Sequence, residues 1–347
     1  MKTTFKLPMV AGLAALLQGC IITNPISNDN FKATENAAYT SDGRLFVIGE
    51  NNQSQSWIFE IRKNADGSYT PTPFVKGTQD GTQNGLPTAA TVGADCTFAG
   101  LTSQGSKLYA ACAKSSGLFG LGAESISLYQ VETTPGQVFI KTGRMEDSNF
   151  LQQDHEKAFD PNWFFANGMA VDSAGHVYIS NSKASIAGNR DAISQVTITD
   201  SGNSNFLDFK HKTWLTGNEF FPNGVQIEGN TLYYAAGSDI DKVRIKSDYS
   251  AGEVRTHFDG SALATIDDFA IEQGYIAYSK VSAPGSVVVL KPASFSYQAK
   301  HLTTVLMPVI PSSIVYQKDM PGDSELFEPN SLLVTSFFSG GLYQIEF

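Results

Sequence analysis

Side chains that carry oxygen recur at equivalent positions of a repeated segment in this sequence. Asn167 and Asn223 are each followed by glycine and then by an apolar strand pattern, while Glu35 and Asp267 stand at the corresponding positions of two similar segments. Carboxylate and amide oxygens are the ligands that calcium prefers. If the fold brings these four residues together, the sequence predicts a calcium site.

The repeated segment has the pattern of a β-hairpin, in which two strands of alternating apolar residues flank a turn that contains glycine. Six copies are found, over residues 34–49, 97–112, 164–180, 220–245, 265–279 and 311–336. The aligned positions, which we call the lead positions, are Glu35, Ala99, Asn167, Asn223, Asp267 and Ser312, and they lie 44 to 68 residues apart.

Six repeats at this spacing, with 31 glycines and almost no helical periodicity, predict an all-β six-bladed β-propeller over residues 32–347. A two-sheet sandwich is the competing architecture, but it gives no reason for one position to recur six times. In a propeller the innermost strands converge on one axis. Residues far apart in the chain would therefore meet there.

The first residues, 1–19, read as an export signal. Lys2 and Lys6 precede an apolar run over 7–17 that is too short to span a bilayer. The run ends in Leu-Gln-Gly before Cys20, which resembles the lipobox of bacterial lipoproteins. The resemblance implies cleavage before Cys20 and lipid on its sulfur. The alternative is an ordinary secretory signal with an incidental cysteine.

Residues 20–31 are then expected to be a lipidated cysteine followed by a tether that contains Asn, Ser and Pro. Ile21, rather than Asp, after the cysteine implies sorting to the outer membrane, facing the periplasm. No later apolar stretch is long enough for a membrane helix, so the lipid is the one membrane anchor that the sequence predicts.

Cys96 and Cys112 lie on the two arms of one predicted hairpin. Antiparallel pairing around the turn at 103–106 would place them nearly opposite each other, and an exported protein meets an oxidising compartment. We predict a disulfide between them. The alternative is two buried thiols.

The formal net charge is −10, and loss of Lys2 and Lys6 with the signal makes it −12. A chain this acidic is not expected to bind nucleic acid. We expect a monomer that acts on a small molecule.

The lead residues also have a structural interpretation, because Asn-Gly is usually a turn and Asn or Asp before a strand often bonds its own backbone. Two aromatic pairs, Phe164-Phe165 and Phe220-Phe221, precede two of the lead positions. They either wall an apolar substrate pocket or pack between blades.

Several stretches together resemble the calcium-dependent six-bladed propellers, which are the paraoxonases and arylesterases and the gluconolactonase and senescence-marker proteins. The stretches are Glu35-Asn36, FFANGMAV, FPNGVQIEGNTLYYAAGSDIDKVRI, Asp267-Asp268-Phe269 and LLVTSFFSGGLYQIEF. The resemblance implies that calcium is held by Glu35, Asn167, Asn223 and Asp267, with Asp268 at a further ligand position. It implies hydrolysis of lactones, aryl esters or organophosphates, with Asp267 as general base or attacking carboxylate.

The sequence departs from the paraoxonase pattern at two places. The segments that match the paraoxonase histidine dyad, near Ala113 and Ser182, contain no histidine, and Asn36 and Gly168 replace acidic residues of a second calcium site. His155 is the one histidine whose position suggests an approach to the site; the alternative is a solvated side chain. A non-catalytic propeller that binds a protein or ligand therefore stays open, as does a relative of the strictosidine-synthase-like group.

Overall fold

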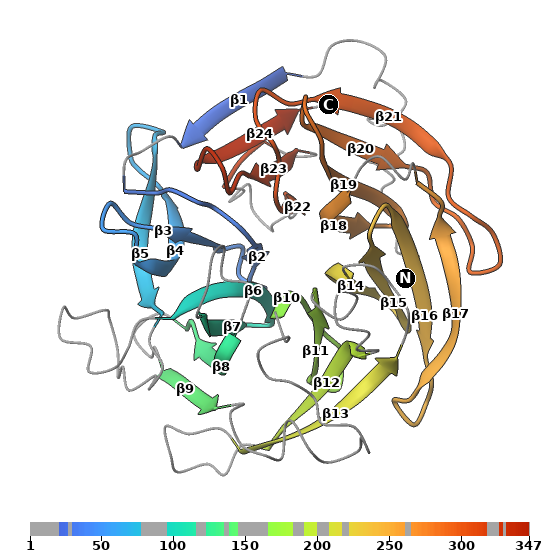
Figure 1. Cartoon of the computed structure of the whole chain (residues 1–347). Helices are drawn as coiled ribbons and strands as arrows, with labels where there is room; N and C mark the ends of the chain where they lie inside the picture. Colours follow the sequence, from blue (N-terminus) through green and yellow to red (C-terminus); the bar gives the residue numbers. More distant parts are fainter. Residues whose placement is uncertain are drawn as a thin grey trace, which may run out of the picture.

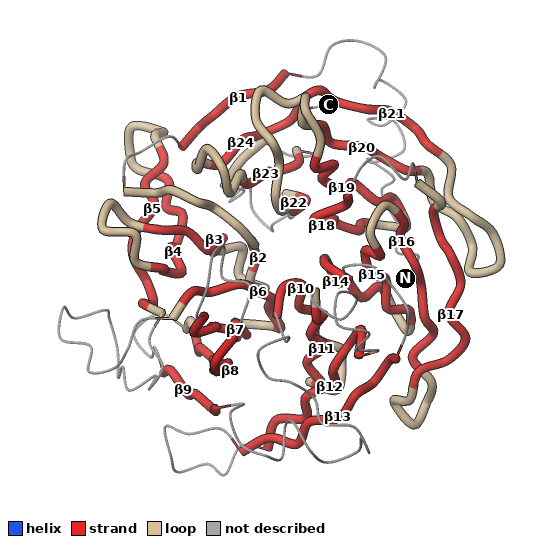
Figure 2. The backbone as a smooth tube through the Cα atoms, viewed as in Figure 1, coloured by secondary structure: helices blue, strands red, loops and turns tan. Residues whose placement is uncertain are grey.

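The computed structural model describes residues 21–26, 30–77, 96–115, 123–134, 139–144, 166–182, 191–199, 208–216, 222–260, 265–317, 326–328 and 331–346. Every regular element in these ranges is a β-strand (Figure 2). Within them, no helix is long and apolar enough to cross a membrane.

Twenty-four strands form six antiparallel sheets of four strands, arranged as a ring around one axis (Figure 1). Blade 1 consists of β2 (Ala37–Tyr39), β3 (Leu45–Glu50), β4 (Ser56–Lys63) and β5 (Tyr69–Lys76). Blade 2 consists of β6 (Thr97–Gln104), β7 (Lys107–Ser115), β8 (Ala123–Glu132) and β9 (Phe139–Arg144). Blade 3 consists of β10 (Ala166–Val171), β11 (His176–Asn181), β12 (Asp191–Thr199) and β13 (Asp208–Thr216). Blade 4 consists of β14 (Pro222–Glu228), β15 (Thr231–Ala236), β16 (Asp239–Ile245) and β17 (Ala251–Phe258). Blade 5 consists of β18 (Thr265–Glu272), β19 (Tyr275–Val281), β20 (Ser286–Leu290) and β21 (His301–Leu306). Blade 6 consists of β22 (Ile314–Tyr316), β23 (Leu332–Thr335), β24 (Leu342–Glu346) and β1 (Ile21–Ile26). The predicted six-bladed β-propeller is confirmed.

The buried apolar residues explain why the blades form a ring. They divide into six clusters, and each cluster joins two neighbouring blades. Met169 and Val177 of blade 3, for example, share a cluster with Tyr109 and Leu128 of blade 2. Because each sheet buries both faces against its neighbours, apolar burial stabilises the ring as a whole.

The last blade takes its outermost strand from the other end of the chain. In β1, Ile21 pairs with Glu346 and Ile26 pairs with Leu342 of β24. Here the structure differs from the sequence interpretation of 20–31 as a tether, because residues 21–26 are part of a blade and Phe31 is buried beside Phe59. The prediction missed this strand because its apolar residues do not alternate strictly and its partner lies more than 300 residues away.

Cys96 and Cys112 are joined by a disulfide, as predicted. Cys112 lies in β7, and Cys96 directly precedes β6, so the bond closes the hairpin that begins blade 2. Gly77 lies against this bond, and a Cβ there would approach the sulfur of Cys112 to 3.0 Å.

Candidate functional site at the propeller axis

The lead residues lie where the innermost strands begin, and on four blades the strand pairing is interrupted there. The register of β6, β10, β14 and β18 shifts between residues 98 and 100, 166 and 169, 222 and 225, and 266 and 269, respectively. Such bulges re-aim side chains out of the regular alternation. They occur at Ala99, Asn167, Asn223 and Asp267, so the sheet irregularity marks the lead positions of blades 2 to 5, three of which are predicted ligands.

A hydroxyl from the second strand of the blade holds the backbone directly after three lead residues, Asn167, Asp267 and Ser312. Ser180 Oγ accepts a hydrogen bond from Gly168 N at 2.8 Å, Ser279 Oγ from Asp268 N at 2.9 Å, and Thr335 Oγ1 from Ser313 N at 2.8 Å. The sequence interpretation did not include these residues. The sequence does carry a signal for them, because each of these hydroxyl residues comes after three or more residues of a second strand that is otherwise largely apolar.

The glycines of the Asn-Gly pairs are explained by the approach of the neighbouring blade. A Cβ at Gly168 would lie 2.6 Å from the backbone nitrogen of Val225, and one at Gly224 would lie 2.8 Å from the Cα of Asp268. Both distances are shorter than a Cβ atom can approach, so neither position accepts a side chain unless the neighbouring backbone shifts. The two Asn-Gly pairs therefore lie in strands, at positions that need a small residue. The interpretation of them as turns is wrong.

Three predicted ligand residues, together with the lead residue Ser312, form one cluster. Asn223 Nδ2 donates to Asp267 Oδ1 at 2.7 Å. The Ser312 hydroxyl lies 2.7 Å from Glu35 Oε2 and 2.8 Å from Asp267 Oδ2. The structure therefore brings Glu35, Asn223 and Asp267 together from blades 1, 4 and 5, with Ser312 of blade 6 as a bridge that the sequence interpretation left without a role.

The two carboxyl groups repel each other if both are bare anions in this arrangement. Ser312 has one hydroxyl proton for two carboxyls, so a proton on one carboxyl or a cation nearby would stabilise the second short contact. Burial and the neighbouring Asp267 raise the pKa of Glu35 to about 8, and burial also raises the pKa of Asp267. In the absence of a cation, the cluster holds a proton at neutral pH.

An amide oxygen in the cluster lacks a partner. Asn223 Nδ2 faces Asp267, whose ionised carboxylate accepts its hydrogen bond, and this orientation turns Oδ1 away. Asn223 Oδ1 is buried and has no hydrogen-bond partner in the part of the chain that is described. A buried oxygen of this kind costs free energy unless a donor or cation meets it. This orphaned oxygen therefore fits a hard cation.

The other two predicted ligand residues are placed differently. Asn167, on blade 3, is half-buried, and its side chain makes no hydrogen bond to any described residue, so its amide is free for a ligand. The Asp268 carboxyl accepts a hydrogen bond from Ser313 Oγ and packs against Gly224, in the contact between blades. Burial raises the pKa of Asp268 to about 7.

Within the described ranges, no three His, Cys, Asp or Glu side chains form a ready-made metal-binding group. The candidate set instead combines the carboxyls of Glu35 and Asp267 with the amides of Asn167 and Asn223. Two carboxylates balance the charge of one divalent cation, and amides add oxygen ligands without further charge. The donor set therefore fits calcium better than a transition metal, which favours nitrogen or sulfur ligands.

Asn36, which follows the lead residue of blade 1, takes part in the blade contacts. Its Nδ2 donates to the carbonyl of Ala99, the lead residue of blade 2, at 2.7 Å. This bond engages the side chain that stands where the resemblance implies an acidic ligand of a second calcium. The structure thus gives Asn36 a role between blades 1 and 2.

The remaining predicted site residues lie outside the described ranges. They are His155, Phe164, Phe165, Phe220, Phe221 and Cys20. Three other histidines have partners away from the cluster: His176 bonds Asp172 at 2.8 Å, His257 bonds Lys242 at 3.0 Å, and His301 bonds Thr304 at 2.9 Å.

A second feature that the sequence interpretation missed is an exposed aromatic pair, Phe337 and Phe338, in the loop that follows β23. They come directly after Ser336 and Thr335, and the hydroxyl of Thr335 donates to the backbone carbonyl of Glu35. The pair is therefore anchored to the end of the blade at which the cluster lies. Exposed aromatic side chains at such a position can contact an apolar ligand.

No family model matches the sequence, and no curated protein matches it. Solved structures do resemble the fold. A gluconolactonase from Xanthomonas campestris superposes with a TM-score of 0.54 at 13% sequence identity, covering 96% of this chain and 92% of that one. A 6-phosphogluconolactonase-like protein from Bacteroides uniformis gives a TM-score of 0.50 at 10% identity, covering 86% and 76%. At these identities the likeness concerns the fold.

Proposed function

We propose that this chain is a hydrolase of lactones or aryl esters that uses one calcium ion at the propeller axis. The observation that carries the proposal is the cluster of Glu35, Asp267 and Asn223, with two carboxyls bridged by Ser312 and a buried amide oxygen that lacks a partner. The fold shared with a gluconolactonase supports the reaction class.

Glu35, Asn167, Asn223 and Asp267 would hold the ion, since their oxygens supply two negative charges and two neutral donors. Calcium, when bound, supplies positive charge that polarises a substrate carbonyl and stabilises the oxyanion that forms on attack. Ser312 and Asn223 contribute by fixing the carboxyl of Asp267 through one contact to each of its oxygens.

Asp267 is the residue proposed to act on the reacting atoms. Its carboxylate could take the proton of an attacking water as a general base. The same carboxylate could instead attack the carbonyl itself, which would give a covalent acyl intermediate. In both cases its orientation depends on Ser312 and Asn223, because these two side chains contact its two oxygens.

The test is turnover of a panel of lactones and aryl esters in calcium and in chelator, with Asp267→Asn beside the wild type. We expect calcium-dependent hydrolysis that falls by about a hundredfold or more in the variant, as for loss of a general base. Asp248→Asn is the control, because Asp248 is an exposed turn residue that bonds Ser250. Turnover that chelator does not change would contradict the proposal.

A fully folded protein that binds calcium but turns over none of these substrates would favour the alternative of a non-catalytic binding module. The absence of histidines at the segments that match the paraoxonase dyad is the observation on which this alternative rests.

We also propose that the protein is exported and lipidated at Cys20, which would anchor it to the outer membrane on the periplasmic side. The disulfide between Cys96 and Cys112 supports export, because disulfides persist in oxidising compartments. Cys20→Ser should move the protein from the membrane fraction to the soluble fraction. Retention of this variant at the membrane would contradict lipidation at Cys20.

A further inference from the structure

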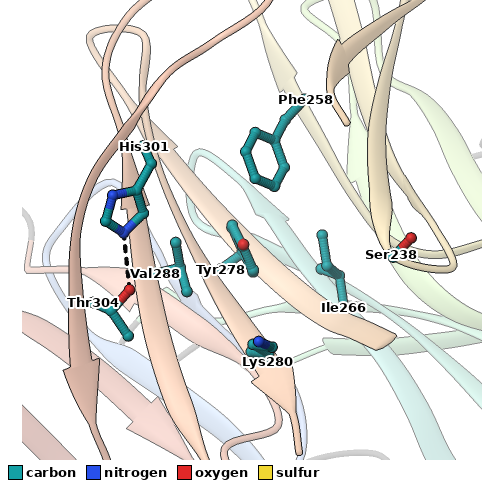
Figure 3. Close-up of a pocket in the computed structure, with 8 residues that line it drawn as sticks. All are labelled: Ser238, Phe258, Ile266, Tyr278, Lys280, Val288, His301 and Thr304. Atoms are coloured by element: carbon teal, nitrogen blue, oxygen red, sulfur yellow. Dashed lines mark hydrogen bonds between the residues drawn. The ribbon is translucent and has the colours of Figure 1, made fainter. Parts of the chain in front are cut away.

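A cavity of about 190 Å³ lies between blades 4 and 5, apart from the axial cluster (Figure 3). Blade 4 contributes Ser238 and Phe258 and blade 5 contributes the other residues of the lining, which are Ile266, Tyr278, Lys280, Val288, His301 and Thr304. Four of these belong to or pack against the apolar cluster that joins the two blades. The cavity is thus a place where the interface between the blades is not filled.

Strand register explains why the blade 5 residues face one space. Tyr278 pairs with Val288, and Val288 pairs with Thr304, so the three side chains form a row across β19, β20 and β21. Lys280 lies two residues after Tyr278 on the same strand and therefore on the same face. Figure 3 shows this row, with Phe258 on one side of it and Lys280 on the other.

Two polar groups in the cavity have no partner in the part of the chain that the structure describes. The Lys280 ammonium makes no hydrogen bond or ion pair there, and neither does the hydroxyl of the buried Tyr278. The other polar groups are engaged: His301 bonds Thr304, and Ser238 donates to Asp239. A cation and a phenol that are partly removed from water favour a ligand that accepts hydrogen bonds.

The remaining walls define what else the ligand must be. Phe258, Ile266 and Val288 are apolar, so a hydrated inorganic anion would gain nothing from them, whereas a compact apolar or aromatic body would. Burial raises the pKa of Tyr278 to about 12, so its hydroxyl remains a donor at neutral pH. Asp239 accepts a hydrogen bond from the lining residue Ser238, and its negative charge near the cavity disfavours ligands with two negative charges.

We propose that this cavity binds small organic monocarboxylates with an aromatic or branched apolar body, the carboxylate meeting Lys280 and Tyr278. Its volume is below the range of about 300–1,000 Å³ that is typical for drug-sized ligands, so the occupant is a molecule of the size of benzoate. The proposal does not depend on calcium or on hydrolysis at the axis.

The test is a titration of benzoate into the purified full chain, with binding measured by calorimetry and by ligand-observed NMR. We expect saturable binding at one site, unchanged by chelator. Lys280→Met keeps most of the side-chain stem and removes the charge, and we expect it to weaken binding by about tenfold or more. Tyr278→Phe should weaken binding less, since it removes one neutral donor.

Benzamide, which has the same body without the charge, serves as the matched ligand control and should bind about tenfold more weakly or not at all. Lys291→Met is the matched protein control, because Lys291 is exposed and lies outside this cavity. Melting curves show whether each variant is folded. The absence of saturable binding to the wild type, or equal binding by the Lys280→Met and Lys291→Met variants, would overturn the proposal.

Discussion

Ser312 changes the interpretation of the axial residues. Sequence alignment of the repeats placed Glu35, Asn223 and Asp267 at equivalent positions, and the structure brings them together. The contact of one hydroxyl with two carboxyls could not be predicted, because it joins blades 1, 5 and 6 through side-chain positions that spacing does not fix. The same holds for the bond from Ser313 to Asp268.

The raised pKa of Glu35 predicts that the free energy of unfolding depends on pH. Its pKa rises from an ordinary 4.5 to about 8 in the folded chain, so the folded state binds this proton more tightly than the unfolded state does. The stabilisation is complete below about pH 4.5 and is lost as the pH rises through about 8. In chelator, the melting temperature of the wild type should therefore fall between about pH 5 and about pH 9.

Glu35→Gln is the matched variant, because it keeps the shape and removes the ionisation. We expect its melting temperature in chelator to fall less over the same range, as followed by circular dichroism. The reference is Glu253→Gln, an exposed glutamate that bonds Arg255. Parallel curves for the wild type and Glu35→Gln would show that Glu35 does not hold the proton.

The innermost strands contain features that a pattern within one strand of the sequence could not predict. The Asn-Gly pairs suggested turns, but Gly168 and Gly224 are small because the next blade passes within van der Waals distance of them. That neighbour is 44 to 57 residues away in the chain, as Asp268 is from Gly224 and Val225 is from Gly168. A pattern within one strand does not contain this information.

Gly224→Ala should therefore destabilise the fold and disturb the site together. The new Cβ would lie 2.8 Å from the Cα of Asp268, and overpacking of this kind costs about 1–3 kcal/mol. We expect a lower midpoint in denaturant unfolding and a weaker response to calcium.

Gly67→Ala is the control for this substitution. Gly67 has a positive φ of 83° and open space around it, so alanine there costs backbone strain alone. It should lower stability without changing the response to calcium. If Gly224→Ala leaves both stability and the calcium response intact, the close blade contact is not a constraint.

In the whole molecule, the ring is closed by strands from the two ends of the chain. The number of blades and the approximate hairpins followed from the repeat, but the closing strand β1 did not, since it is not part of a repeat. β1 starts at Ile21, beside the end of β24 that lies away from the axial cluster, and runs to Ile26 at the cluster end.

Closure predicts unequal effects of the two terminal isoleucines of β1. Ile26 is 2% exposed and packs in the cluster that joins blades 6 and 1, whereas Ile21 is 57% exposed. Ile26→Ala should cost about 2–5 kcal/mol of unfolding free energy, as for other buried isoleucines. Ile21→Ala should change stability by about 0.5 kcal/mol or less. Equal effects in denaturant unfolding would show that β1 does not close the ring.

The central claim is a calcium site at the axis, and the most direct test is the melting temperature of the purified protein in chelator and in millimolar calcium. A ligand that binds the folded state at a thousandfold excess over its Kd stabilises it by about 4 kcal/mol. We predict a clear upward shift for the wild type and for Asn230→Ala, an exposed turn asparagine, and none for Asn223→Ala. No shift in the wild type, or the same shift in Asn223→Ala, would contradict the claim.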